Sequence, residues 1–576
     1  MRSHPVRFKA SRHGPGAVLL FFSGAGFASE FDLPCLGWQV TVKTVVAEAG
    51  RCVLIIEILP SEGWTRMAKL LRSSARRAVS LALAIVGLIA VNIEPAAAVN
   101  LDWTRQLGTS AREDNYAVSA DGIGNVYISG YTQGALQGSN VGARDAFVAK
   151  YDSTGTKLWT KQLGTTVDDR GWGVSADGLG NVYMSGTTGG SLQGTNLGGT
   201  DAFLTKYDSS GALQWTRQLG TTVDDDCRSV YADGAGNVYI SGFTSGSMQG
   251  SNAGLTDAFV TKYNSAGAMQ WTRQLGTTST DYSYGVTADA SGNVYISGTT
   301  SGHFQGSGGV TEDAFVAKYN SAGTLQWTRQ LGTSTTADRN FTVSVDTLGH
   351  VFISGVTNGA LGGPNAGGFD AYVAEYDTSG NKLWTRQFGT SGDEDVHSVT
   401  TDNLGNVYIS GVTPGSLDGT NAGGQDAFVA KYDEKANQLW VRQLGSSADD
   451  VSTAISSDHM GGVYLSGMTT GNLGGTNAGS YDVFVAKYSD LPLVGDYDGD
   501  GAVDANDYQV WRATYGSSGS QLAADGNQDG VVNAADYIVW RDRYVAAGAG
   551  SAVAVPEPSS VVLLILGFVA AVKKRI

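Results

Sequence analysis

The chain is poor in cysteine, proline and histidine. It holds 3 cysteines, 10 prolines and 6 histidines among 576 residues. Cys35 and Cys52 lie in the first 98 residues, so Cys227 stands alone beyond them and no intramolecular disulfide can form there. The sequence contains no Cys–His pair, no zinc-ligand spacing and no Gly-x-Ser-x-Gly elbow. These absences argue against zinc chemistry and against the common nucleophilic hydrolases.

Basic residues are also scarce. The whole chain has a formal net charge of −16, with 38 basic and 54 acidic residues. Residues 1–98 carry 11 of the basic and 6 of the acidic residues, which leaves 27 against 48 and a net charge of −21 for the remainder. A nucleic-acid partner is therefore not expected, because phosphate binding needs a basic surface. The acidic surface permits cation binding.

Against these absences stands a repeat with a period of 56 residues, extended once to 57. Its clearest markers are seven tryptophans: Trp103, Trp159, Trp215, Trp271, Trp327, Trp384 and Trp440. An Asp-Ala-Phe-like cluster keeps the same step from Asp145 to Asp482. Seven copies of one module at this period predict a β-propeller or a related array. The 80 glycines suit many tight turns between short strands.

Each unit contains four short segments with the alternation of strands. In the first unit these are residues 116–121, 125–132, 145–152 and 158–164. An Asp, then Gly three residues later, precedes the second segment in every unit, as at Asp121 and Gly124, and we interpret this Asp as a turn former. The Trp segment at 103 has no partner before it, and the segment at 483–488 has none after it. We therefore predict a circular body in which the first strand completes the last blade.

The recurring strings resemble the SBBP family of β-propeller repeats over residues 103–488. The Asp–Gly–Asn-Val-Tyr-Ile-Ser-Gly and Asp-Ala-Phe-Val-Ala-Lys-Tyr strings carry the resemblance, together with the Trp-x-Arg-Gln-Leu-Gly segment. The resemblance implies a seven-bladed, all-β propeller in which the recurrent aromatic residues pack the blades.

Acidic residues follow every Trp segment, from Glu113 and Asp114 to Asp449 and Asp450. They could form a cation-collecting ring near the axis. Alternatively, they could start strands through side-chain hydrogen bonds to the backbone, which the sequence favours. The four histidines past residue 98 share no repeat position, with His303 and His397 expected in loops and His350 and His459 in hairpin turns. No blade stands out as catalytic.

Residues 496–507 and 525–536 each have the oxygen-rich spacing of a calcium loop. Calcium takes six to eight oxygen ligands from a flexible loop that turns at a glycine, here Gly501 and Gly530. A short helix bearing Tyr and Trp on one face is expected after each loop. The predicted ligands are Asp496, Asp498, Asp500, Ala502 (backbone carbonyl), Asp504 and Asp507, then Asp525, Asn527, Asp529, Val531 (backbone carbonyl), Asn533 and Asp536.

The final ligand of each loop is Asp rather than Glu, and the loops occur in tandem. These features resemble a type I dockerin over residues 496–544, with an EF-hand-like loop ahead of a single helix. The resemblance implies two bound Ca²⁺ ions and a cohesin-like partner. Positions ten and eleven of dockerin loops often carry hydroxyl groups, but here they are Ala505-Asn506 and Ala534-Ala535. At these positions the sequence departs from the dockerin pattern, whereas the predicted metal ligands follow it.

The two ends of the chain read as targeting segments. Residues 67–98 have a basic region, an apolar run at 78–91 and an Ala-Ala-Ala cleavage site, as in a secretory signal. Residues 1–66 precede it and are either a miscalled start or a long leader. The Val-Pro-Glu-Pro at 555–558, the apolar run at 561–572 and the basic end resemble a PEP-CTERM sorting signal, which implies processing by an exosortase. A plain tail anchor is the alternative.

The expected organisation is a miscalled start or leader (1–66), a signal peptide (67–98), a propeller (99–490), a dockerin-like module (491–546) and a linker with sorting tail (547–576). We predict an exported, envelope- or matrix-associated binding or scaffolding protein, with an extracellular polysaccharide among its partners and membrane contact only through the tail. A carbohydrate-active enzyme, either a glycoside hydrolase or a lyase with its site on the propeller face, is the alternative. A structural matrix component is the third hypothesis.

Overall fold

The computed structural model describes most of the chain between residues 99 and 547. The described residues are 17–22, 30–35, 38–47, 51–60, 99–304, 312–333, 336–402, 404–459, 461–489, 495, 497, 505–519, 522, 524–527 and 529–547. The chain divides into two compact units, Met1–Glu94 and Pro95–Ile576. Among the described residues, no helix combines the length and apolar character needed to cross a bilayer. The predicted signal peptide and sorting tail lie outside the described residues.

The first unit contains a four-stranded antiparallel sheet that the sequence repeat does not foreshadow. Its strands are β1 (Ala17–Phe22), β2 (Glu30–Cys35), β3 (Trp38–Ala47) and β4 (Arg51–Pro60), in the order β1-β4-β3-β2. Hydrophobic and β-branched residues dominate β3 and β4, which suits strands.

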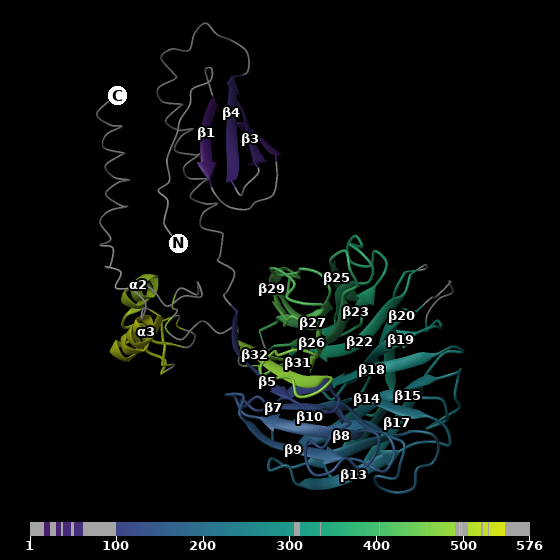
Figure 1. Cartoon of the computed structure of the whole chain (residues 1–576). Helices are drawn as coiled ribbons and strands as arrows, with labels where there is room; N and C mark the ends of the chain where they lie inside the picture. The colour runs from purple at the N-terminus through teal and green to yellow at the C-terminus, as the bar shows by residue number, and fades with distance from the viewer. Residues whose placement is uncertain are drawn as a thin grey trace. The chain divides into compact units, whose positions relative to one another are not determined.

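The second unit contains a seven-bladed propeller, as predicted, with four antiparallel strands in each blade (Figure 1). The innermost strands are β6 (Glu113–Ala120), β10 (Asp169–Ala176), β14 (Asp225–Ala232), β18 (Asp281–Ala288), β22 (Asp338–Val345), β26 (Asp395–Thr401) and β30 (Asp450–Ser457). The second strands are β7 (Val126–Thr132), β11 (Val182–Thr188), β15 (Asn237–Thr244), β19 (Val294–Thr300), β23 (Val351–Thr357), β27 (Val407–Thr413) and β31 (Gly462–Thr469).

The third strands are β8 (Asp145–Tyr151), β12 (Asp201–Tyr207), β16 (Asp257–Asn264), β20 (Asp313–Tyr319), β24 (Asp370–Tyr376), β28 (Asp426–Tyr432) and β32 (Asp482–Ser489). The outermost strands are β9 (Lys157–Leu163), β13 (Leu213–Leu219), β17 (Met269–Leu275), β21 (Leu325–Leu331), β25 (Lys382–Phe388), β29 (Gln438–Leu444) and β5 (Asn100–Leu107). We number the blades one to seven along the chain, so that blade one contains β6–β9 and blade seven contains β30–β32 with β5. Each innermost strand contacts the innermost strands of both neighbouring blades, so these seven strands close a ring.

The circle closes through the first strand of the propeller. β5 pairs antiparallel with β32 in the last blade, with Leu107 opposite Val483 and Trp103 opposite Lys487. Figure 1 shows β5 in the same sheet as β31 and β32, with β32 as its neighbour. The predicted closure is therefore confirmed, and the hydrogen-bonding edge of β32 is covered by a strand from the other end of the propeller.

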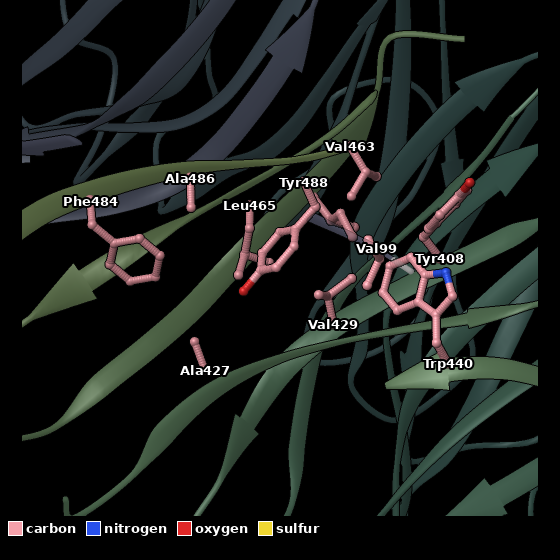
Figure 2. Close-up of a cluster of buried hydrophobic side chains, with 11 residues drawn as sticks. Val99, Tyr408, Ala427, Val429, Trp440, Val463, Leu465, Phe484, Ala486 and Tyr488 are labelled. Carbon is pink, nitrogen blue, oxygen red and sulfur yellow. The ribbon is translucent and has the colours of Figure 1, made fainter. Parts of the chain in front are cut away.

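The core lies between the blades. In the cluster of Figure 2, Tyr408, Val429 and Trp440 of blade six pack with Leu465 and Phe484 of blade seven and with the segment just before β5. The other six propeller clusters likewise combine residues of two adjacent blades. No blade completes a core alone, so each blade is stabilised chiefly by its neighbours.

Two strings of the repeat meet at a buried carboxylate. In the first blade Gln162 Nε2 donates to Asp145 Oδ2 (2.9 Å), and the Val141 N–H donates to the same oxygen (2.9 Å). A Cβ on Gly164 would lie 2.2 Å from Asp145 Oδ1, so only glycine fits beside the carboxylate. This contact explains why the Asp of Asp-Ala-Phe recurs together with Gln-Leu-Gly.

Trp and Arg of the outer strand tie each blade to the next. Trp215 Nε1 donates to Ser265 O (3.2 Å), and Arg217 Nε donates to Gly267 O (2.7 Å), both in the β16–β17 turn of the following blade. The turn glycines at this position have φ near +75° to +79°. In blade six the position is Ala436, with φ +62° and a buried side chain. Trp384 of blade five, which faces that turn, lacks the indole hydrogen bond seen at Trp215.

Every innermost strand carries one extra residue. The register of β10 against β11 skips Trp172, between Gly171 and Gly173, and the same skip recurs in all seven blades. Each skip is a β-bulge, which leaves one residue unpaired and re-aims its side chain.

Two helices, α2 (Ala505–Thr514) and α3 (Ala534–Ala547), lie in the predicted calcium module. The fold class, a seven-bladed propeller followed by a small α module, is thus confirmed.

Deleting residues 100–107 should abolish cooperative melting or cause aggregation. The deletion exposes the edge of β32 and removes Leu107 and Trp103 from the core between the first and last blades. Differential scanning calorimetry and light scattering measure both effects. A truncation after residue 490, which leaves every described propeller strand in place, is the control and should melt like the parent propeller. An unchanged transition in the deletion variant would show that closure is dispensable.

Ala436→Gly should stabilise the propeller by about 1 kcal/mol, because glycine removes the left-handed strain of an L-residue but loses more chain entropy on folding. We expect Tm to rise by about 1–3 °C in calorimetry. Gly380→Ala at the equivalent turn is the matched reverse variant. Its Cβ would lie 2.9 Å from Trp327 Cδ2 at φ +79°, so this variant should melt earlier. Equal Tm values for the two variants would contradict the strain argument.

Candidate functional site

The second predicted calcium loop is folded by its own side chains. Asp525 accepts hydrogen bonds from the N–H groups of Asp529 (3.0 Å) and Gly530 (2.8 Å), and Asn527 Oδ1 accepts from Asp529 N–H (3.1 Å). Asp529 Oδ1 accepts from Val531 N–H (2.9 Å). Gly530, at φ +83°, makes the turn at the sixth position. These bonds curl the predicted ligands into one loop.

Asp536 joins the two ends of this loop and is fully buried. Its Oδ1 accepts from Asn527 N–H (3.1 Å) and its Oδ2 accepts from Asn533 N–H (2.8 Å). Asn533 in turn accepts from Ala535 N–H (2.7 Å), so Asn533 and Asp536 form a reciprocal cap at the start of α3. The closing carboxylate therefore holds both the loop and the helix.

The first loop is described only in part. Asp507, its closing residue, is fully buried and accepts a hydrogen bond from Tyr497 N–H (2.5 Å). The predicted ligands Asp496, Asp498, Asp500, Ala502 and Asp504 lie outside the described residues. Asp507 thus resembles Asp536 in burial and in its place at the third position of a helix.

The second loop fits a hard cation by the chemistry of its donors. Asp525, Asn527, Asp529, Asn533 and Asp536 offer oxygen ligands, and hydrogen bonding from Asn527 holds the pKa of Asp529 below its ordinary value, so this carboxylate is charged at neutral pH. Among the described residues, no three His, Cys, Asp or Glu side chains gather into a metal-holding group. The set in this loop is instead mixed, with carboxylate and amide oxygens.

Aromatic residues pack the two helices of the module together. The ring centroids of Trp511 and Tyr537 lie 5.1 Å apart, and those of Tyr508 and Trp540 lie 5.3 Å apart. Trp511 Nε1 also donates to Asn533 O (2.8 Å), which ties the first helix to the second loop. The predicted aromatic face is therefore the contact between α2 and α3.

The acidic residues at the start of the innermost strands are buried and used internally. Glu113 accepts from Thr109 N–H (2.7 Å), Thr109 Oγ1 (2.7 Å) and Thr132 Oγ1 (2.7 Å). Equivalent threonine or serine bonds occur at Asp169, Asp225, Asp281, Asp338, Glu394 and Asp450. For these seven carboxylates the structure confirms that they begin strands through side-chain hydrogen bonds to backbone N–H groups. The hairpin Asp121 also acts as predicted, accepting from Ile123 and Asn125.

Blade five breaks the repeat, although no exceptional blade was expected. Other blades place a Lys ammonium over a Tyr ring, as with Lys318 and Tyr295 (5.2 Å). Blade five has Glu375 and Phe352 at these positions, and His350 Nδ1 lies 3.0 Å from Glu375 Oε1. Burial raises the pKa of Glu375 above its ordinary value. Blade five thus has Glu375, Phe352 and His350 where Lys, Tyr and most often Asn stand in the other blades. A His–carboxylate contact replaces the cation–aromatic contact.

The prediction that His397 lies in a loop is wrong, because His397 is the bulge residue of β26. Its Nδ1 lies 2.7 Å from Ser452 O and its Nε2 lies 3.3 Å from Asp395 Oδ2. Burial alone would lower the pKa of His397, but the hydrogen bond and charge of Asp395 outweigh it and raise the pKa.

The seven bulge residues form a ring that sequence reasoning missed. They are Tyr116, Trp172, Arg228, Tyr284, Phe341, His397 and Thr453, one from each innermost strand and all partly exposed. We call this set the bulge ring. The sequence carries a signal for the ring other than strand alternation, since each member lies three residues after the strand-start carboxylate and between two positions that hold mostly small residues.

Neighbours in the bulge ring contact one another. The Tyr116 and Trp172 ring centroids are 4.3 Å apart, and Arg228 Cζ lies 4.1 Å from the Trp172 centroid. Tyr284 and Phe341 are 5.9 Å apart, and Phe341 and His397 are 6.1 Å apart. Thr453 Oγ1 donates to Asn115 Oδ1 (3.1 Å), beside Tyr116. These contacts connect the bulge residues of blades one, two and three with one another, and likewise those of blades four, five and six. A further contact connects blade seven to blade one.

Two protein families match parts of the chain. The family described as Beta-propeller repeat (SBBP) matches residues 158–193, 214–247, 270–305 and 383–418. The family described as Dockerin type I domain matches residues 494–540. The chain therefore contains SBBP β-propeller repeats and a type I dockerin domain.

Curated relatives are distant. The chain is 21% identical over 531 residues to an uncharacterized WD repeat-containing protein of Acanthamoeba polyphaga mimivirus, covering 68% of this chain and 38% of the relative. It is 25% identical over 425 residues to the regulatory protein FlaEY of Caulobacter vibrioides, covering 64% and 44%. The chain thus spans about two fifths of the length of these relatives.

The comparison with solved structures matches a puromycin hydrolase with TM-score 0.40 and 13% identity, covering 64% of this chain and 51% of that one. An ulvan lyase structure gives TM-score 0.40 and 11% identity, covering 66% and 95%.

Mild acidification should stabilise the propeller. Burial raises the pKa of Asp169, Asp225, Asp281 and Asp450, so their protonated forms are favoured by folding. The stability contributed by a raised carboxyl pKa is present at low pH and is lost as pH rises through the folded-state value. His397 acts in the same direction. We expect calorimetric Tm to rise by a few degrees between pH 7.5 and pH 5.

High salt separates this effect from general charge repulsion. At 0.5 M NaCl, repulsion between distant surface carboxylates is largely screened, whereas the desolvation of buried groups is not. The rise in Tm should persist in that buffer. Below the ordinary carboxyl range the exposed turn residues Asp152, Asp208 and Asp377, whose pKa values are lowered by hydrogen bonds, reverse the trend. A Tm that falls steadily from pH 7.5 to pH 5 would contradict the prediction.

Proposed function

We propose that this protein is an exported docking and scaffolding protein whose propeller is a binding platform and whose dockerin domain attaches it to a partner in the presence of calcium. The observation that carries the proposal is the dockerin type I match at 494–540. In the second loop of that domain, side-chain oxygens accept hydrogen bonds from backbone N–H groups, which brings the predicted oxygen ligands together. Asp536 closes this loop.

Calcium would serve this module as a structural clamp. Asp525, Asn527, Asp529, Val531 (through its carbonyl), Asn533 and Asp536 would hold one ion, and the loop ending at Asp507 would hold the second. Each loop brings several carboxylates into a short segment, where their charges repel each other in the absence of a cation. Binding energy gained only in the folded state adds to the stability of the module.

The partner we propose is a cohesin-like protein. Dockerin domains bind cohesins, and the exposed surface of the helices is where a partner chain has access, with Ile538 of α3 47% exposed. Ala534 and Ala535 at the start of α3 replace the hydroxyl residues common there, so we expect a cohesin with a more apolar contact surface than usual. Retention at the cell envelope and exosortase processing are further proposals that rest on the tail sequence alone.

The test is calcium titration of the full chain by isothermal calorimetry. We expect two calcium-binding sites in the parent protein and one in Asp536→Ala, because this change removes a closing ligand. Asp507→Ala should remove the other site. Asp418→Ala removes an exposed propeller carboxylate and is the control that should keep both sites. Two results together would overturn the proposal: no heat of calcium binding, and a circular dichroism spectrum that is the same in calcium and in chelator.

Docking itself is tested with cohesin modules of known sequence. Surface plasmon resonance with immobilised cohesins should show binding to the full chain that chelator abolishes. Asp536→Ala should weaken this binding, and Asp418→Ala should not. Calcium binding without binding to any cohesin would leave the metal role standing and remove the cohesin partner.

A further inference from the structure

We propose that the bulge ring is a binding site for an uncharged carbohydrate, which deepens the proposed function by naming the ligand of the propeller platform. The inference rests on three features of the ring: its large, varied side chains, its partly exposed aromatic rings, and its unpartnered polar atoms, with a carboxylate beside each cation.

The first argument concerns variation inside one chain. The seven blades place the bulge residue in the same backbone setting, between the same paired neighbours. A position dictated by blade folding should repeat, as the buried carboxylate of Asp-Ala-Phe does. The bulge position instead carries six residue types in seven blades, and most of these side chains are large, whereas the positions before and after it vary mostly among small residues. Folding does not prescribe them, so they are available for recognition.

The second argument concerns shape and surface chemistry. Tyr116, Trp172, Tyr284 and Phe341 place aromatic rings around the innermost strands, and all four are partly exposed, with Arg228 covering part of the Trp172 ring (4.1 Å). The face of an aromatic ring is negative, and the axial C–H bonds on the face of a pyranose are weakly positive. Flat aromatic groups therefore suit sugar rings, which they can stack against without a charge on either partner.

The third argument concerns hydrogen bonding. Trp172 Nε1 and Arg228 Nε are buried donors without an acceptor, and Asp395 Oδ1, beside His397, is a buried acceptor without a donor. An unpartnered buried polar atom costs about 1–3 kcal/mol, which a bound polar group can offset once side chains shift to admit it. Sugar hydroxyls both donate and accept, and so can serve both kinds of atom.

Charge favours a neutral ligand. Arg228 lies 4.0 Å from Asp226, and His397 lies 3.3 Å from Asp395, so each cation of the ring has its own carboxylate. The ring offers no surplus positive charge to an anion, and the chain as a whole is strongly acidic. A polyanionic glycan would be repelled. A peptide strand is also disfavoured, because each bulge interrupts the regular backbone edge that strand addition needs.

The experiment is isothermal calorimetry of the full chain with four neutral hexasaccharides, made of β-1,4-glucose, xylose, mannose and α-1,4-glucose. A hexagalacturonate and a soluble Gly-Ser hexapeptide are the charged and peptide arms. We expect at least one neutral hexasaccharide to bind, with Kd raised about tenfold or more by Trp172→Ala. Trp172→Phe keeps a ring but loses the N–H, and should raise Kd about three- to tenfold. Arg228→Met should weaken binding similarly.

Lys157→Met, which removes an exposed cation from the outer strand β9, is the matched control and should bind like the parent. Calorimetric melting shows which variants fold, and Trp172→Phe and Arg228→Lys keep the test open if larger changes unfold the blade. Binding of no neutral sugar at millimolar concentration, binding only of hexagalacturonate or peptide, or sugar binding unchanged in both Trp172→Phe and Arg228→Met would each overturn the proposal.

Running every titration in chelator and again in calcium separates this proposal from the docking proposal. The bulge ring contains no calcium loop, so sugar binding should survive chelation while dockerin docking is lost. Sugar binding with failed docking would leave the ring proposal standing, and the reverse result would remove only the ring.

Discussion

Burial between adjacent blades is the interaction on which the propeller depends. Each hydrophobic cluster takes its members from two neighbouring sheets, so a single four-stranded blade would expose half of its core. The arrangement is stable only when every blade has two neighbours, which requires a closed circle. The pairing of β5 with β32 closes the circle and joins the first and last strands of the propeller, so that all seven blades form one cooperative unit.

A closed circle of near-identical blades tolerates exceptions only where a neighbour compensates. In blade five the usual Lys over Tyr is replaced by Glu375 over Phe352, and His350 approaches that carboxylate. A buried Glu without a partner would carry the full cost of desolvation, so the His substitution is what makes the Glu acceptable. Ala436 is a second exception: its left-handed backbone coincides with the loss of the Trp384 indole bond to this turn, while Arg386 Nε still donates to Ala436 O (3.0 Å).

The fold could be predicted from the sequence because periodicity and turn chemistry are local signals. The strand segments, the hairpin at Asp121 and the unpaired segment at Trp103 are sufficient to predict both the blades and their closure. The ring of bulge residues could not be found in this way. A bulge shifts register by one residue, and strand alternation alone does not reveal which residue is left unpaired. The loop prediction for His397 fails for the same reason. The acidic residues before it are typical of a loop, and alternation does not reveal a strand that contains one extra residue.

The dockerin ligands show the opposite balance. Their identity follows from spacing alone, yet the structure adds that Asp536 also caps α3 through Asn533. One carboxylate thus serves the loop, the helix and, in the proposed function, the ion. Loss of its charge would therefore weaken helix and metal site together, whereas the two cations of the bulge ring are each matched by a neighbouring carboxylate and the ring takes its order from the surrounding blades. Two sites with such different physical bases can work independently in one chain, as a scaffold that joins two unlike partners requires.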